Sequence, residues 1–238
     1  MLPDSPSHPD TARQSQTEPQ TESQFQPQSQ AQSQTQGLGA VMAAVRQSVE
    51  PSDAGGALPV DPLEAHWTTR KLPPVERWNP ASCGDIAIEI KANGEWWHEG
   101  QRIGRAPLVT LFSSVLWREG DDFFLKTPVE KMRIRVEDVP FQITEMRRLP
   151  HDTFPQLQLR TPQGDVVTVD EAHPLNFHSP HHEPESEQRL YVQLRPGIEA
   201  CLSRSLFYSL IDQSELSTHE GQTELVIRSG DYRASWTL

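Results

Sequence analysis

The chain has 238 residues, of which 35% are hydrophobic and 23% charged, and its formal net charge is −12 at pH 7. This acidic balance argues against a protein that binds the nucleic-acid backbone, because such proteins need clustered Lys and Arg. Two cysteines are too few for a disulfide framework, and no apolar run approaches the roughly eighteen residues of a membrane span. No secretory signal follows Met1, so we expect a cytoplasmic protein.

Residues 1–60 differ in composition from the rest of the chain. Glutamine occupies every second position from Gln24 to Gln36, and large apolar side chains are scarce in this tract. Such a segment buries too little apolar surface to offset the entropy lost on ordering. We therefore predict a disordered tail over 1–60, which includes a short helix at 40–49 that Pro51 ends.

A lead-in arm is predicted at residues 61–83, where four prolines prevent one long helix. In the next segment, 84–90, isoleucines alternate with small or charged residues, which is typical of a strand. Asn93 and Gly94 then indicate a type I′ turn that leads into a second strand. We expect a β-hairpin with one apolar face.

A helix is predicted from Pro107, with Gly120 as its stop. Its apolar residues fall at the spacing of one helix face: Leu108, Leu111, Phe112, Val115 and Leu116. Two strands, 123–126 and 131–137, then form a second hairpin. These elements make a first repeat at residues 84–148 with the order strand, strand, helix, strand, strand.

The remaining residues, 149–238, are predicted to be a second copy of that unit. Leu111–Leu116 recurs as Leu206–Ile211, an offset of 95 residues, and flanking strand-like segments recur in the same order. A second helix is predicted from Ile198, and a polar insertion at 172–187 lengthens this copy. Further strands are predicted at 141–148, 156–160, 164–170, 190–194, 223–227 and 232–236.

These elements predict an α+β fold made by internal duplication of a β-β-α-β-β unit, with antiparallel sheets that are each backed by one helix. A duplicated unit creates a seam between its copies, and ligand clefts form preferentially at such seams. The sequence thus predicts the place of a site before it indicates any chemistry.

The insertion contains several histidines that are close enough in sequence to hold a metal ion. They are His173, His178, His181 and His182, followed by Glu183. Their spacing matches no structural zinc pattern, and prolines keep the segment irregular. We interpret it as a solvated polar loop and predict neither a metal site nor a cofactor.

Two groups of residues have the chemistry of a site. Asp170, Glu171 and His173 have the residue types of a base and its orienter, with no nucleophile beside them in the sequence. Arg105 precedes the first helix, whose free backbone amides favour a phosphate or carboxylate, and its structural pairing with Glu99 is an equal alternative. No Walker loop, H-E-x-x-H, EF-hand loop or C-x-x-C motif is present, which favours a non-enzymatic protein without assigned catalytic residues.

Six ordered blocks stand out between about Asp61 and Leu238. They are Ile103–Phe112, Arg118–Asp121, Thr127–Lys131, Val136–Phe141, Asp170–Leu175 and Leu202–Tyr208. Together they resemble the bacterial domain-of-unknown-function family numbered 1285. The resemblance implies a core built by duplication, a later half loosely similar to a pleckstrin-homology-like barrel, a nucleotide-like ligand between the halves and a role in signal transduction.

The resemblance also places Arg105, Lys131, His173 and Arg204 near the seam, and Tyr208 of the last block joins them as a ligand-binding residue. We therefore expect a binding module that takes an anionic, nucleotide-like small molecule between the repeats. Two alternatives stay open. One is an interaction scaffold whose glutamine-rich tail and strand edges bind a protein partner. The other is a hydrolase-like enzyme that uses Asp170, Glu171 and His173, with Arg105 as an anion clamp.

Overall fold

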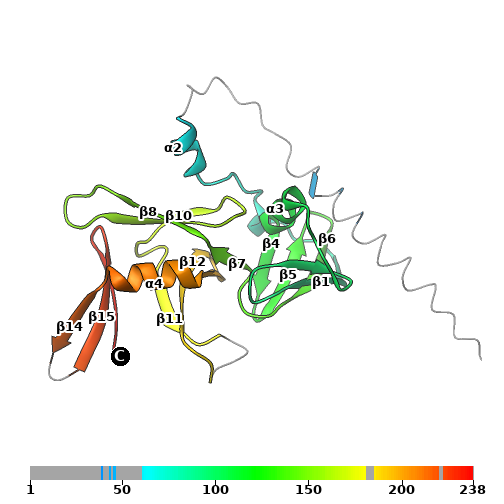
Figure 1. The fold of residues 1–238 in the computed structure, drawn as a ribbon. Coiled ribbons are helices and arrows are strands. Elements are labelled where there is room, and N and C mark those ends of the chain that lie inside the picture. The colour runs from blue at the N-terminus through cyan, green and yellow to red at the C-terminus, as the bar shows by residue number, and fades with distance from the viewer. Residues whose placement is uncertain are drawn as a thin grey trace, which may run out of the picture.

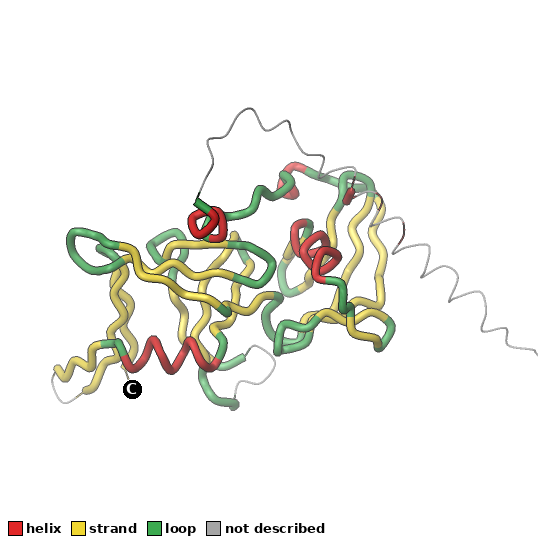
Figure 2. Tube along the Cα trace, turned by 45° about the horizontal axis from the view of Figure 1, so that its top comes forward, coloured by secondary structure: helices red, strands yellow, loops and turns green. Residues whose placement is uncertain are grey.

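The computed structural model describes residues 39, 43, 45, 46, 61–180, 185–219 and 222–237. The tail predicted over residues 1–60 lies outside the described residues, apart from the four single positions, which are helical. The described part has an α+β fold of several sheets with few helices (Figures 1 and 2). The predicted fold class is thus confirmed at this level.

The N-terminal half contains a six-stranded sheet against which one helix packs, α3 (Ala106–Ser114). The strands are β1 (Ser82–Ile90), β2 (Trp96–His98), β3 (Gln101–Arg102), β4 (Leu116–Glu119), β5 (Asp122–Lys126) and β6 (Glu130–Val136). Their order is β3-β2-β1-β6-β5-β4, and neighbours are antiparallel except for β1 and β6, which are parallel. The β1–β6 pair therefore closes the two hairpins of this half into one sheet.

The core of this half follows the predicted alternation along β1. Ile86, Ile88 and Ile90 are buried and lie on one face of the strand, since side chains two residues apart share a face. The rings of Trp96 and Phe112 stack at 6.3 Å between centroids, which joins β2 to α3. A turn precedes β2 as predicted, but the predicted type I′ is wrong, because that type needs a positive φ at both Asn93 and Gly94 and only Gly94, with a φ of 81°, has one.

The C-terminal half contains three smaller sheets and one helix, α4 (Arg204–Asp212). Its strands are β7 (Phe141–Ile143), β8 (Glu145–Leu149), β9 (Gln156–Arg160), β10 (Val166–Thr168), β11 (Leu175–His178), β12 (Arg189–Arg195), β13 (Ile198–Leu202), β14 (Glu215–His219), β15 (Gln222–Ser229) and β16 (Tyr232–Thr237). The sheet orders are β10-β9-β8, β11-β12-β13-β7 and β14-β15-β16. Figure 1 shows these elements in colours that run from green at β7 through yellow to red at β15, beside the N-terminal half.

The lead-in arm contains α2 (Pro62–His66) and a short 3-10 helix, η1 (Val75–Arg77). Although the arm precedes the N-terminal half in sequence, its start packs on the C-terminal half. Arg147 of β8 pairs with Glu64 at 2.9 Å and lies 4.8 Å from the centre of the Trp67 ring. The arm therefore spans both halves of the fold.

The first predicted helix was too long. α3 ends at Ser114, where the hydroxyls of Ser113 and Ser114 donate to carbonyl oxygens of the preceding turn. Leu116 is buried, but it is the first residue of the strand β4 rather than part of the helix. Gly120, the predicted helix stop, lies in the β4–β5 turn with a φ of 60°. The sequence pattern overestimated the length of the helix, because an apolar side chain at a helical spacing can equally be buried by a following strand.

The second predicted helix began too early. Ile198 lies in β13, which Gly197 with a φ of 73° joins to β12, and α4 begins only at Arg204. Ile198 and Leu202 fit both periods, because a separation of four residues is one helical step and two strand repeats. Residues 198–202 form a strand because they pair with β12 on one side and β7 on the other.

Part of the predicted polar insertion also forms a strand. β11 pairs with β12, and Leu175 is buried, so this part of the insertion belongs to the core. Residues 181–184, which include His181, His182 and Glu183, lie outside the described residues.

A pair of strands, a helix and a three-stranded meander occur in this order in both halves. They are β2-β3, α3 and β4-β5-β6 in the first, and β12-β13, α4 and β14-β15-β16 in the second. The pairing differs, because the first meander joins the sheet through β1 whereas the second forms a sheet of its own. The duplication and the pleckstrin-homology-like resemblance stay predictions.

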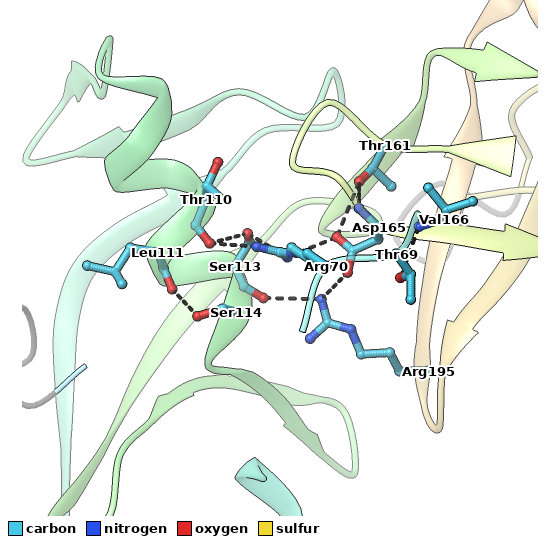
Figure 3. A network of polar contacts seen from close by, with 10 residues as sticks. All are labelled: Thr69, Arg70, Thr110, Leu111, Ser113, Ser114, Thr161, Asp165, Val166 and Arg195. Atoms are coloured by element: carbon cyan, nitrogen blue, oxygen red, sulfur yellow. Dashed lines mark hydrogen bonds and ion pairs between the residues drawn. The ribbon is translucent and has the colours of Figure 1, made fainter. Parts of the chain in front are cut away.

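A buried ion cluster joins the arm, α3 and the C-terminal half (Figure 3). Asp165 accepts hydrogen bonds from Arg70 at 2.9 Å and from Arg195 at 3.0 Å. The same two arginines donate to the carbonyl oxygens of Thr110 and Ser113 in the last turn of α3, at 2.7 and 3.2 Å. The carbonyl end of a helix carries partial negative charge, so it favours both cations.

The cluster is shielded from water, since only 6% of the Asp165 side chain and 15% of each arginine side chain are exposed. Burial lowers the pKa of Arg195, and the charge of Asp165 opposes that shift. The fit of the two halves therefore depends on the charge of one carboxylate.

Asp165→Asn keeps the size of this side chain and removes its charge. We expect the free energy of unfolding to fall by about 3–5 kcal/mol, because the two guanidinium groups lose their buried counter-charge. Urea unfolding at pH 7, followed by tryptophan fluorescence, measures the change. The control Asp85→Asn removes the partner of Arg133 in an exposed pair and should have almost no effect. Equal effects of the two substitutions would show that burial is not what gives Asp165 its importance.

Candidate functional site

A pocket of about 330 Å³ opens where the turn between β1 and β2 meets the C-terminal half. Its walls come from that turn, β7, β12 with the residues before it, the end of β13 and α4. The lining residues are Ala92, Asn93, Gln142, residues 187–190, Cys201, Leu202, Arg204, Phe207 and Tyr208. The volume lies within the range of small-molecule sites, about 300–1,000 Å³. We refer to it as the seam pocket.

The two halves touch directly beside the seam pocket. The side-chain amide of Gln142 donates to the carbonyl oxygen of Ala92 at 3.0 Å. Gly94 faces the same side chain, and a Cβ at this position would lie 2.6 Å from Cγ of Gln142. A glycine is therefore needed both for its positive φ and for this close approach.

A buried acid lies beneath the pocket wall. Asp138 accepts a hydrogen bond from the hydroxyl of Tyr191 at 3.0 Å and pairs with Arg189 at 3.6 Å. The Asp138 side chain is only 2% exposed, whereas that of Arg189 is 36% exposed. Asp138 thus holds the guanidinium of Arg189, a residue that lines the pocket and keeps part of its side chain exposed.

Two buried titratable groups near Asp138 are held neutral. Burial, followed by the charge of Asp138, raises the pKa of Tyr191 above its usual value. The same two effects raise the pKa of the Cys201 thiol to about 12. The thiol that lines the pocket is therefore protonated at neutral pH and acts as a small apolar group.

The rim of the seam pocket is formed by α4. Arg204 pairs with Glu187 at 3.4 Å, and both side chains are exposed. The ring of Tyr208 is also exposed and lies edge-on to Phe207, with 5.5 Å between centroids. The pocket therefore combines two guanidinium groups with an apolar and aromatic wall.

A larger hollow of about 640 Å³ crosses the outer face of the six-stranded sheet. Its charged side chains already pair with one another, for example Arg133 with Asp85 at 2.7 Å. Its lining has five carboxylates and only two arginines, so its net negative charge disfavours an anionic ligand and this hollow is the weaker candidate.

The predicted site residues do not converge on one place. Arg204 and Tyr208 line the seam pocket, whereas Arg105 lines a groove at the start of α3. Lys131 pairs with Glu119 and lies 4.8 Å from the centre of the Phe124 ring, and the hydrogen bond to Glu119 raises the pKa of Lys131. His173 lies 3.2 Å from Asp170 in a turn.

Asp170 organises that turn. Its Oδ1 accepts from the backbone amides of Ala172 and His173, both at 2.9 Å, as well as lying near the His173 ring. Asp170 and Glu171 line a hollow of about 420 Å³ that also contains Ser229. The hydroxyl of Ser229 is buried and donates to the carbonyl oxygen of Val169, so it already has a structural role.

Within the part of the chain that the structure describes, no group of three or more His, Cys, Asp or Glu side chains is placed to hold a metal ion. His178 of the predicted polar loop instead stacks on Tyr191 at 4.1 Å between ring centroids. Over the same residues, no helix has the length and apolar character to cross a membrane.

Sequence reasoning missed three residues of the seam pocket and its support. Arg189 stands at the start of a predicted strand, and Asp138 lies in a block that carries the family resemblance, so both had a weak signal. Gln142 had none, because its contact with Ala92 joins segments 50 residues apart. Only the packing of the two halves brings these groups together.

Two family models match the chain. The "Domain of unknown function (DUF1285), N-terminal domain" matches residues 73–139, and the "Protein of unknown function (DUF1285), C-terminal domain" matches residues 140–234. The models meet at residues 139 and 140, whereas the sequence predicts the repeat boundary at 148 and 149.

Two solved structures are similar to the chain. The crystal structure of a DUF1285 family protein from Silicibacter pomeroyi DSS-3 is 33% identical, covers 78% of this chain and 88% of its own, and has a TM-score of 0.59. A DUF1285 family protein from Shewanella baltica OS155 is 29% identical over 53% of this chain and 91% of its own, with a TM-score of 0.43. No curated protein matches the chain.

The two cysteines should differ sharply in reactivity. Cys83 is exposed, whereas Cys201 is buried with a pKa raised to about 12. At pH 8 we expect one thiol per chain to react quickly with a disulfide reagent and the other only after unfolding. Absorbance of the released thiolate measures both phases, and Cys83→Ser should remove the fast phase alone. Two fast thiols in the native protein would contradict this description of the pocket wall.

Proposed function

We propose a binding function for this chain, which belongs to the DUF1285 family. The seam pocket takes a small anionic molecule, and a nucleotide-like compound is the class that we propose. The observation that carries the proposal is the pair of guanidinium groups, Arg189 and Arg204, on an otherwise largely apolar wall at the junction of the two halves.

The chemistry of the wall favours a ligand with two different ends. Arginine binds carboxylate and phosphate groups through paired N–H donors. Phe207, Tyr208 and Leu190 offer a flat and apolar surface on which a ring can pack. The amides of Asn93 and Gln142 add donors and acceptors from the other half of the molecule, so a bound ligand would touch both halves.

The carboxylates near the pocket affect how strongly its two arginines can bind an anion. Asp138 is buried and fixes Arg189, so it acts as a support rather than a competitor. Glu187 is exposed and holds only Arg204, so an incoming anion competes with it directly. Exposed ion pairs are weak, and this exchange therefore costs little.

Substitutions of this exposed pair test the proposal. The test begins with a thermal-shift screen of nucleoside monophosphates, cyclic nucleotides, dinucleotides and aromatic carboxylates. The affinity of each compound that stabilises the protein is then measured by calorimetry. Arg204→Gln should weaken binding about three- to tenfold, and Glu187→Gln should tighten it about two- to fivefold, because it removes the competing carboxylate.

The opposite directions of these two effects separate binding from folding. Both positions are exposed, so neither substitution should change the unfolding temperature of the free protein. Arg77→Gln provides a matched control, since Arg77 and its partner Glu76 are both exposed but lie outside the seam pocket. No stabilising compound in the panel, or equal affinities in all variants, would refute the proposal.

An interaction scaffold is the second candidate function. Leu216 is 66% exposed on β14, which is an edge strand of its sheet in the described part of the chain. Exposed edge strands can pair with a strand of another protein. For either function we propose a cytoplasmic protein, and a role in signalling belongs to the same proposal.

A further inference from the structure

The sheet covers only part of the apolar surface of helix α3. Phe112 is fully buried, whereas Leu108 and Leu111 are half-buried and lie three residues apart on one flank of the helix. Residues at this spacing form a continuous stripe, so the flank is apolar over about one helical turn. Such a flank requires a second cover.

A groove of about 620 Å³ runs along this flank. Residues 104–108 and Leu111 of the N-terminal half line it, and Arg46 of the N-terminal segment already lies at its border. Apart from the two arginines, its lining residues are a glycine and residues with apolar side chains. The groove therefore fits an apolar helix face better than it fits a charged ligand.

The N-terminal segment reaches this part of the molecule through Val45. Val45 is fully buried and belongs to the same core as Leu108 and Leu111, whereas Ala43 and Arg46 are exposed. All three positions are helical, and Figure 1 shows the short helical piece beside α3. A buried valine between exposed neighbours is the pattern of a helix that docks through one face.

We propose that the flank of α3 is a docking groove for an amphipathic helix, and that its occupant is the chain's own N-terminal segment, anchored by Val45. The sequence around Val45 supports this occupant, because Leu38, Val41 and Met42 stand seven, four and three residues before it. The tether to Asp61 also favours it, since a linked segment has an effective concentration near the millimolar range and needs only a weak contact.

Trypsin measures this docking in the full-length protein. Cleavage after Arg46 requires the segment to leave the groove, whereas cleavage after Arg13 in the same tail serves as the internal reference. The ratio of the two initial rates is read by mass spectrometry. In the wild-type chain we expect cleavage after Arg46 to be at least about tenfold slower, the factor that a contact of about 1.4 kcal/mol produces.

Two substitutions with the same change of charge form a matched pair. Val45→Glu should bring the Arg46 rate up to the Arg13 rate, because a carboxylate cannot occupy the apolar groove. Ala43→Glu introduces a residue of good helix propensity at an exposed helical position, so its carboxylate meets solvent and the ratio should stay at the wild-type value. Val45→Ala is the milder variant and should raise the ratio about threefold, whether or not Val45→Glu lowers the stability of the fold.

A synthetic peptide of residues 36–49 in which Arg46→Gln removes the trypsin site tests whether the groove itself is the binding site. Added in excess to the wild-type chain, it should speed cleavage after Arg46, whereas the same peptide with Val45→Glu should not. Equal rates at Arg46 and Arg13 in the wild-type chain would overturn the proposal, and so would equal responses to Val45→Glu and Ala43→Glu. None of these readouts involves the seam pocket, so the anion-binding proposal stands or falls separately.

Discussion

The charge on Asp165 is the constraint on which the arrangement of the two halves depends. Three segments that are far apart in sequence present polar groups to it: the lead-in arm through Arg70, the C-terminal half through Arg195, and the end of α3 through its carbonyl oxygens. Two buried cations need a buried anion and a negative helix end, and they find both at one point. A polar junction of this kind fixes orientation more strictly than an apolar contact, because hydrogen bonds tolerate little displacement.

The seam pocket is a consequence of that fixed orientation. Its N-terminal wall is a single turn, Ala92 and Asn93, and its other walls come from β7, β12, β13 and α4. The hydrogen bond from Gln142 to Ala92 holds the turn against β7, and Gly94 allows that approach. The affinity for a ligand that contacts both walls would thus depend on the relative position of the two halves. This dependence makes a binding function compatible with a signalling function.

Local pattern predicted most of the strands but not their partners. The isoleucines of β1 and the place of the turn at Asn93-Gly94 were recognised because period-two alternation and turn residues are encoded within a few positions, whereas the type of the turn was not. Leu116 and Ile198 were assigned to helices because an apolar residue at every fourth position satisfies both a helix and a strand, and only pairing with a neighbouring strand decides. The Asp165 cluster and the Gln142 contact were beyond sequence reasoning, since each joins residues that become neighbours only after the halves have packed.

The same limit explains why five predicted ligand-binding residues divide among separate places. Arg204 and Tyr208 lie one turn apart on α4, so local spacing alone brings them to one rim. Lys131 already has a carboxylate partner, and His173 lies against the carboxylate of Asp170. Arg105 borders a groove whose side chains are largely apolar and beside which Val45 is buried, so its surroundings suit a helix face rather than an anion. Arg204 differs from Lys131 and His173 because it lines the seam pocket, and because its partner Glu187 is the most exposed of the three carboxylates and so the easiest for an anion to replace.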